Sequence, residues 1–142
     1  MTVSAPPIYD QVIDDQGKAK LSWANFFQQT FDGDAGTLWT PTFVSLTEVG
    51  TPVIDGRYYR LTKYLTFFKV VITPGTSTTS TAGTTYIDNY PITFTGDGIC
   101  FAVSGNLGTS SGHIVASSNR IYVPGWSAVT VPLTIIGIGE AT

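Results

Sequence analysis

From about residue 42 to the C-terminus, short runs of β-branched and aromatic residues recur, and every gap between them except Thr62-Lys63 contains Gly, Pro, Asn or Asp. The spacing is close to the roughly 8 to 12 residues typical of β-sandwiches and barrels. Because strands and helices do not alternate, a parallel sheet is not expected. The pattern predicts a mainly β chain folded as an antiparallel sandwich. The expected strands are Thr42 to Leu46, Val53 to Leu61, Tyr64 to Thr73, Thr85 to Ile87, Ile92 to Thr95, Ile99 to Ser104, Gly112 to Ala116, Ile121 to Val123 and Val129 to Ile138.

The strongest strand signal is Tyr64 to Thr73, which is rich in β-branched and aromatic residues and lacks Gly and Pro. Apolar residues occupy both of its faces. This pattern predicts a central strand that is covered by the core on one side and by a partner on the other. The segment that follows, Pro74 to Thr85, is uncharged and consists mostly of Thr, Ser and Gly. It is predicted to be an exposed loop with weak order.

The N-terminal region has a different pattern. Residues 1–21 predict an extended arm, since they contain two prolines and a turn signal at Asp14 to Gly17. A short helix is predicted to begin at Ser22 and to end at Gly33. Its aromatic face places four residues at positions i, i+3, i+4 and i+8: Trp23, Phe26, Phe27 and Phe31. A helix this short needs packing, either on its own β body or on another subunit or protein. The predicted organisation is therefore an arm and helix over residues 1–35 and a β domain over residues 36–142.

Length and charge exclude several classes of protein. The 142 residues suffice for one domain, with a formal net charge of −3 and a sequence pI near 4.7. That charge excludes the basic surface that non-specific nucleic-acid binding requires. The apolar runs are shorter than the roughly 18 to 20 residues of a membrane-spanning helix, so no membrane insertion is expected. The N-terminus lacks a secretory signal pattern, and synthesis in a cytoplasm is expected.

Residues that carry chemistry are few. Cys100 is the only cysteine, which excludes an intrachain disulfide and a cysteine-based zinc site, and its apolar neighbours predict a small buried side chain. His113 is the only histidine, and no Gly-x-Ser-x-Gly elbow accompanies it, so a catalytic triad is not expected. Asp32 and Asp34 have the spacing that begins a calcium loop but lack its remaining ligands.

Four further carboxylates have neighbours that predict solvated turn residues: Glu48, Asp55, Asp88 and Asp97. A glycosidase would need two of them held about 5 to 9.5 Å apart. Together these observations predict no catalytic residues, no metal site and no cofactor, and therefore no enzyme.

Aromatic residues near the C-terminus suggest a different kind of site. Asn119, Tyr122 and Trp126 lie on a predicted strand and the Pro-Gly turn after it. Sugar rings stack on Tyr and Trp, and Asn binds hydroxyl groups, so these three residues are candidates for a receptor or glycan site. The alternative is that Trp126 closes one end of the sandwich.

The order of several motifs resembles the small β modules of tailed-bacteriophage fibre and appendage proteins. Motifs in the β region are Gly36 to Phe43, Leu46 to Pro52, Gly56 to Tyr59, the Phe67-Phe68 strand and Thr81 to Tyr86. Upstream, Asp14 to Lys18 leading into Trp23, Phe26 and Phe27 is similar to the attachment segment of such virion proteins.

The resemblance implies a jelly-roll-like sandwich that assembles as a homotrimer and serves as a short tail fibre or appendage without catalytic activity. Residues 1–35, with Trp23, Phe26, Phe27 and Phe31, would attach it to a tail adaptor, a nozzle or a capsid protein of the virion. Two alternatives remain open at this point. One is a capsid decoration or head-fibre protein, and the other is a carbohydrate-binding module that recognises a host surface glycan.

Overall fold

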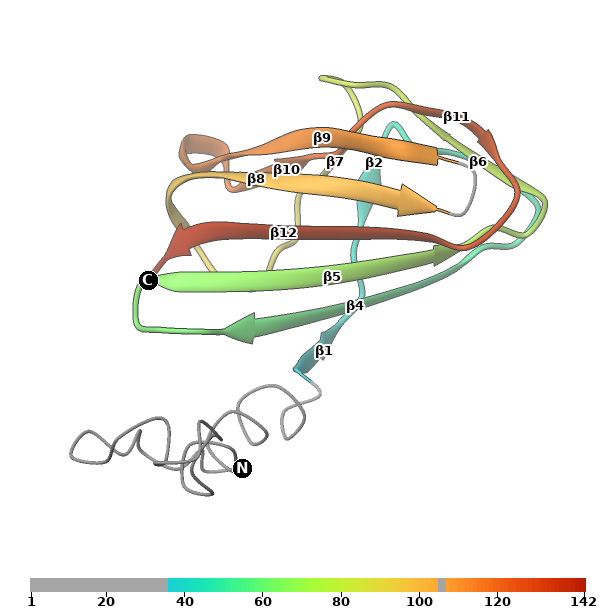
Figure 1. Ribbon diagram of the computed structural model, residues 1–142. Helices are drawn as coiled ribbons and strands as arrows, with labels where there is room; N and C mark the ends of the chain where they lie inside the picture. The colour runs from blue at the N-terminus through green and yellow to red at the C-terminus, as the bar shows by residue number, and fades with distance from the viewer. Residues whose placement is uncertain (1–35, 105–106) are drawn as a thin grey trace, which may run out of the picture. The chain divides into compact units, whose positions relative to one another are not determined.

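The computed structural model describes residues 36–104 and 107–142. The chain divides into two units, residues 1–36 and 37–142. The predicted arm and helix, including all four candidate anchor residues, lie outside the described residues. The second unit is mainly β, as the sequence pattern predicts (Figure 1). Its elements are β1 (Thr37–Trp39), β2 (Phe43–Val44), β3 (Thr47–Val49), β4 (Val53–Arg60), β5 (Leu65–Thr73), β6 (Ser77–Ser80), β7 (Tyr86–Ile87), β8 (Phe94–Ser104), β9 (Leu107–Val115), the 3-10 turn η1 (Ala116–Ser118), β10 (Arg120–Tyr122), β11 (Trp126–Val129) and β12 (Leu133–Ala141).

The strands form one large and one small antiparallel sheet. The large sheet has nine strands in the order β1-β4-β5-β12-β8-β9-β10-β7-β2, and the small sheet has the order β11-β6-β3. The C-terminal strand β12 lies between β5 and β8, where Ile135 pairs with Val70 on one side and with Ala102 on the other. The centre of the large sheet is thus assembled from distant parts of the chain.

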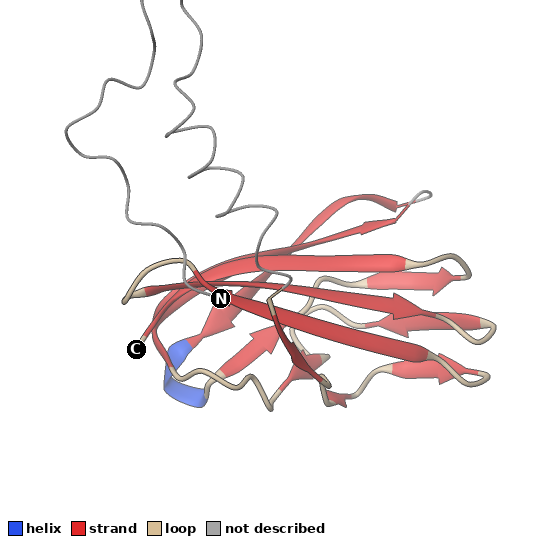
Figure 2. Cartoon of the chain, turned by 90° about the horizontal axis from the view of Figure 1, so that it is seen from below, coloured by secondary structure: helices blue, strands red, loops and turns tan. Residues whose placement is uncertain are grey.

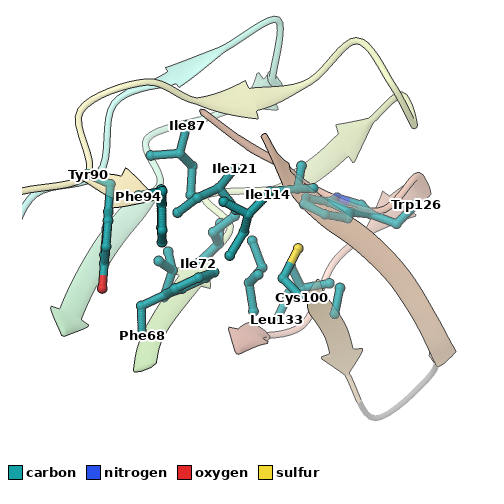
Figure 3. Packing of buried hydrophobic residues seen from close by; sticks show 14 of the residues in the cluster. Phe68, Ile72, Ile87, Tyr90, Phe94, Cys100, Ile114, Ile121, Trp126 and Leu133 are labelled. Atoms are coloured by element: carbon teal, nitrogen blue, oxygen red, sulfur yellow. The ribbon is translucent and has the colours of Figure 1, made fainter. Parts of the chain in front are cut away.

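The large sheet curls so that its two ends share one core. β5 and β7 are separated by four strands, which would place them about 24 Å apart in a flat sheet. Nevertheless, Phe68 of β5 and Ile87 of β7 belong to the same buried cluster (Figure 3). The curved strands of the sheet are seen from below in Figure 2. The seam is the place where the two ends of the curled sheet meet. Tyr90, three residues after β7, closes it because its ring packs edge-on against Phe68 at a centroid distance of 5.5 Å. Burial of this shared cluster is the main stabilising contribution to such a fold.

Gly137 of β12 makes close packing in this core possible. A Cβ atom at this position would lie 2.6 Å from Phe68 Cε1 and 2.8 Å from Cys100 Cβ. Both neighbours are fully buried. The absent side chain therefore leaves the space that the Phe68 ring fills.

The prediction that Pro74 to Thr85 forms an exposed loop is wrong for its central part. Residues Ser77–Ser80 form β6, in which Thr78 and Ser80 are buried. Their hydroxyls have partners: Thr78 donates to Glu48 Oε1 at 2.9 Å, and Ser80 donates to the carbonyl of Pro124. Thr is also β-branched and fits a strand well. Low sequence complexity therefore did not prevent β structure here, because long-range partners satisfy the hydroxyl groups.

Several predicted strand boundaries also differ. The two strands expected at Ile92 to Thr95 and Ile99 to Ser104 are one continuous strand, β8, which runs through Gly96 and Gly98. Conversely, the strand expected at Val129 to Ile138 begins only at Leu133, as β12, and its first residue, Val129, ends β11, which belongs to the other sheet. β1 and β3 were not predicted. In the described ranges, no helix has the length and apolar character needed to cross a bilayer.

Candidate functional site

The most distinctive surface of the described unit is the outer face of the large sheet, opposite the core. Successive residues of a strand point to opposite faces. Phe68, Val70 and Ile72 of β5 are fully buried, so their neighbours in sequence point away from the core. The same alternation holds on β12 and β8. We define the outer face by its apolar members: Phe67, Val71, Ile99, Phe101, Val103, Ile136 and Ile138.

Five of these outer-face residues lie directly beside one another in the sheet register, whereas Val71 and Val103 lie on either side of Thr134. Ile138 of β12 pairs with Phe67 of β5 and with Ile99 of β8. In the next row, Ile136 pairs with Phe101. The side chains of Ile99, Val103 and Ile138 are 43%, 45% and 37% exposed. Exposed large aliphatic side chains on one face make this face the candidate interaction surface of the described unit.

A shallow hollow of about 470 Å³ opens at one end of the outer face. Its lining includes the apolar residues Leu65, Ile99 and Ile138 and the acidic residues Asp97 and Glu140. Asp97 Oδ1 also accepts a hydrogen bond from the backbone N–H of Ala116 at 3.2 Å. The hollow thus combines an apolar floor with negative charge, which suits a cationic side chain better than an anion.

A ladder of rings continues the sheet surface beyond β8. His113 of β9 stacks on Tyr122 of β10 at 5.1 Å and 11°, and Tyr122 meets Tyr86 of β7 at 5.3 Å. The guanidinium of Arg120 lies over the Tyr86 ring, 4.3 Å from its centroid. A hydrogen bond with Tyr122 raises the pKa of Arg120. Because the ring faces contact each other or Arg120, the ladder stabilises the sheet through cross-strand pairs.

The three glycan candidates do not form one exposed surface. Trp126 is only 4% exposed and its ring lies in the core, which is consistent with the alternative that it closes the fold (Figure 3). The side chain of Asn119 accepts the N–H of Phe94 at 2.8 Å and donates to the carbonyl of Tyr90 at 3.4 Å. Tyr122 belongs to the ring ladder. A sugar would therefore find neither a free indole face nor a free amide at these positions.

The carboxylates predicted to be solvated turn residues have varied surroundings. Asp55 lies on β4 and Asp97 on β8, and both are exposed, as is Asp88 beyond β7. Glu48 differs more strongly from the prediction, since Oε1 accepts the Thr78 hydroxyl and Oε2 is buried without a partner. The local sequence did not reveal this burial because β6, which covers Glu48, is thirty residues away.

The single cysteine is buried, as predicted. Cys100 is fully buried, and burial raises the pKa of its thiol to about 12. The thiol is therefore protonated and unreactive at neutral pH. His113 is exposed on the sheet surface. In residues 36–104 and 107–142, no group of three or more His, Cys, Asp or Glu side chains is arranged to hold a metal ion.

Sequence reasoning found part of the outer face and missed the rest. The apolar character of both faces of Tyr64 to Thr73 predicted a partner-covered surface, and Phe67 and Val71 lie on it. Ile99, Phe101 and Ile138 were not assigned to it, although their runs also lack alternation. That feature, apolar residues at successive positions in a strand, was the available signal.

Comparison with known proteins adds no assignment: no family model, curated protein or solved structure matches this chain.

Proposed function

We propose that this chain is a non-enzymatic structural subunit of a tailed-bacteriophage virion. In this proposal it is a short tail fibre or appendage protein that forms a jelly-roll-like homotrimer. Residues 1–35 attach it to another virion protein, and the β unit projects outward. Assembly into the virion follows synthesis in the host cytoplasm.

The observation that carries the proposal is the apolar outer face. Ile99, Val103 and Ile138 are exposed at the centre of a sheet, where an isolated subunit gains nothing from them. Covering such a face with protein removes apolar area from water, at roughly 25 cal/mol per Å². An assembly subunit needs a surface of this type. The motif resemblance stated above supplies the phage context.

Fractionation of phage particles tests the virion assignment. Particles from the infected host are banded by density, and an antibody against this chain locates it. We expect the chain to band with complete particles at a fixed copy number. Separate bands of heads and tails then distinguish a tail fibre from a capsid decoration or head-fibre protein. A chain that remains entirely in the unbanded protein fraction would overturn the virion assignment.

A variant pair tests the attachment segment. Phe27→Asp is expected to release the chain from the particles, since it introduces charge into the proposed anchor. Tyr64→Asp is the matched control, because Tyr64 is 59% exposed in the β unit. Retention of Phe27→Asp on particles would contradict attachment through this residue.

A further inference from the structure

We propose that the hollow at the end of the outer face receives a lysine side chain of a partner protein, while apolar residues of that partner cover the neighbouring part of the face. The hollow is lined by Leu65, Asp97, Ile99, Ile138 and Glu140, together with two glycines. The partner would therefore present an exposed lysine within an apolar surface. This inference concerns the β unit alone and does not depend on the virion assignment.

An irregularity in the pairing of β8 with β12 brings two carboxylates from neighbouring strands to the hollow. The register shifts between Gly139 and Ala141, so that residues 95–97 of β8 lie opposite the single residue Glu140. Extra residues in one strand, as in β-bulges, change the direction in which that strand presents its side chains. Asp97 is one of these extra residues, and it lines the same hollow as Glu140.

Both carboxylates are held in place by β8 or by the segment that follows β9. A Cβ atom at Gly96 would lie 3.1 Å from Glu140 Cδ, so the Glu140 carboxylate lies against the backbone of β8. Asp97 Oδ1 accepts the backbone N–H of Ala116 at 3.2 Å. Groups that are positioned in advance lose less conformational freedom when a ligand binds. The hollow is thus prepared for a cation.

No ion pair within residues 36–104 and 107–142 neutralises the two carboxylates. Leu65 is the register partner of Glu140, and Lys69 lies four residues further along β5. Four residues of a strand span about 13 Å, which is beyond the reach of an ion pair. The guanidinium of Arg120 lies over the ring of Tyr86, 4.3 Å from its centroid. A cation from outside the described unit would therefore gain a direct contact with both carboxylates.

Lysine matches both the apolar and the acidic part of the hollow. Its aliphatic stem can lie along Leu65, Ile99 and Ile138, because lysine buries this stem on apolar surface and keeps its charged group near water. Its ammonium group has three donors, which suffice for carboxylates on two strands. A divalent metal ion needs about six oxygen ligands, whereas the described residues contain no group of three or more metal-binding side chains. Two carboxylates would repel an anion.

Titration of the full-length chain with Nα-acetyl-lysine methylamide tests the site. Two-dimensional NMR of the isotopically labelled protein follows the backbone amide signals. We expect shifts at millimolar ligand that are confined to residues 97–99 and 138–140. The norleucine analogue keeps an apolar side chain of similar length but lacks the charge, and it should bind more weakly. Shifts spread over other strands, no shifts, or equal binding of the two ligands would overturn the inference.

Four variants separate the carboxylates from the rest of the surface. Glu140→Gln and Asp97→Asn should each weaken binding of the lysine ligand about two- to fivefold, the range for an exposed ion pair. Asparagine keeps an oxygen that can accept the N–H of Ala116. Gly96→Ala should also weaken binding, although it leaves the charge unchanged, because its Cβ displaces the Glu140 carboxylate. Asp88→Asn is the matched control, since this exposed carboxylate lies outside the hollow.

Circular dichroism verifies that each variant is folded. Unchanged binding in all three hollow variants would overturn the inference, as would an equal loss in Asp88→Asn. Either result would leave the virion assignment intact, because the particle fractionation tests that assignment independently.

Discussion

The hydroxyl of Tyr90 lies 2.6 Å from Thr66 Oγ1, at the seam where the curled sheet meets itself. Thr66 Oγ1 also donates a hydrogen bond to the carbonyl of Tyr59 at 3.1 Å. Because a threonine hydroxyl has one proton, Tyr90 must be the donor in the bond between the two side chains. This bond connects β5 to the segment after β7, two parts of the chain that share no strand pairing.

Removing the Tyr90 hydroxyl should weaken the seam but leave it closed. Tyr90→Phe is expected to lower the free energy of unfolding by about 1 kcal/mol, since the ring remains packed and Thr66 keeps its bond to Tyr59. Urea unfolding measures the change. Tyr64→Phe removes an exposed phenol and should change stability by less than about 0.5 kcal/mol. Equal stability of Tyr90→Phe and the wild type would contradict a structural role for the bond.

Alkaline pH should destabilise the fold through two buried acids. Burial raises the pKa of Tyr90 to about 12, and that of Cys100 to about 12. In the unfolded chain these groups lose their protons at lower pH, Tyr90 near pH 10 and Cys100 near pH 9. Deprotonation therefore favours the unfolded state. The free energy of unfolding should fall from about pH 9 to pH 12, by at most about 1.4 kcal/mol per pH unit for each group. Urea unfolding from pH 8 to 12 should show a shallower decline for Tyr90→Phe, and identical slopes would contradict this assignment.

Adding one methyl group at Gly137 should be strongly destabilising. The new Cβ in Gly137→Ala would lie 2.6 Å from Phe68 Cε1, so the ring or β12 must shift. Overpacking of this kind typically costs about 1 to 3 kcal/mol. Thermal unfolding provides the measurement. Gly83→Asn is the control, because Gly83 has open space around it and Asn tolerates its positive φ. An unchanged melting temperature for Gly137→Ala would show that the core adapts easily.

The strand β6 should depend on the hydroxyl of Thr78. Thr78→Val keeps the shape but removes the donor to Glu48 Oε1, while Oε2 already lacks a partner. Leaving a buried carboxylate less satisfied is expected to cost about 1 to 3 kcal/mol. Exposed Thr76→Val should have little effect in the same urea titration. If the two variants unfolded at the same urea concentration, the hydrogen bond from Thr78 of β6 to Glu48 of β3 would make no measurable contribution to stability.

The candidate site could be predicted from the sequence only where a local signal existed. Phe67 and Val71 were predicted because their strand is apolar at successive positions, which one buried face alone does not require. Ile138 could not be assigned to the same surface, since only the insertion of β12 beside β5 brings it there. Trp126 shows the converse. Its Pro-Gly neighbours left two possibilities open, an exposed ring or a ring that closes one end of the sandwich. The ring is buried because it packs against distant strands.

The sequence alone determined the antiparallel β class, the positions of several strands and the burial of Cys100, because these follow from residue types within a few positions of one another. Only the tertiary structure decided the strand order, the placement of β12 between β5 and β8, the strand within the Thr- and Ser-rich segment and the seam of Thr66 with Tyr90. The reason is physical. A strand completes its hydrogen bonds with whichever strand lies beside it, and that choice depends on how the whole chain buries its apolar surface.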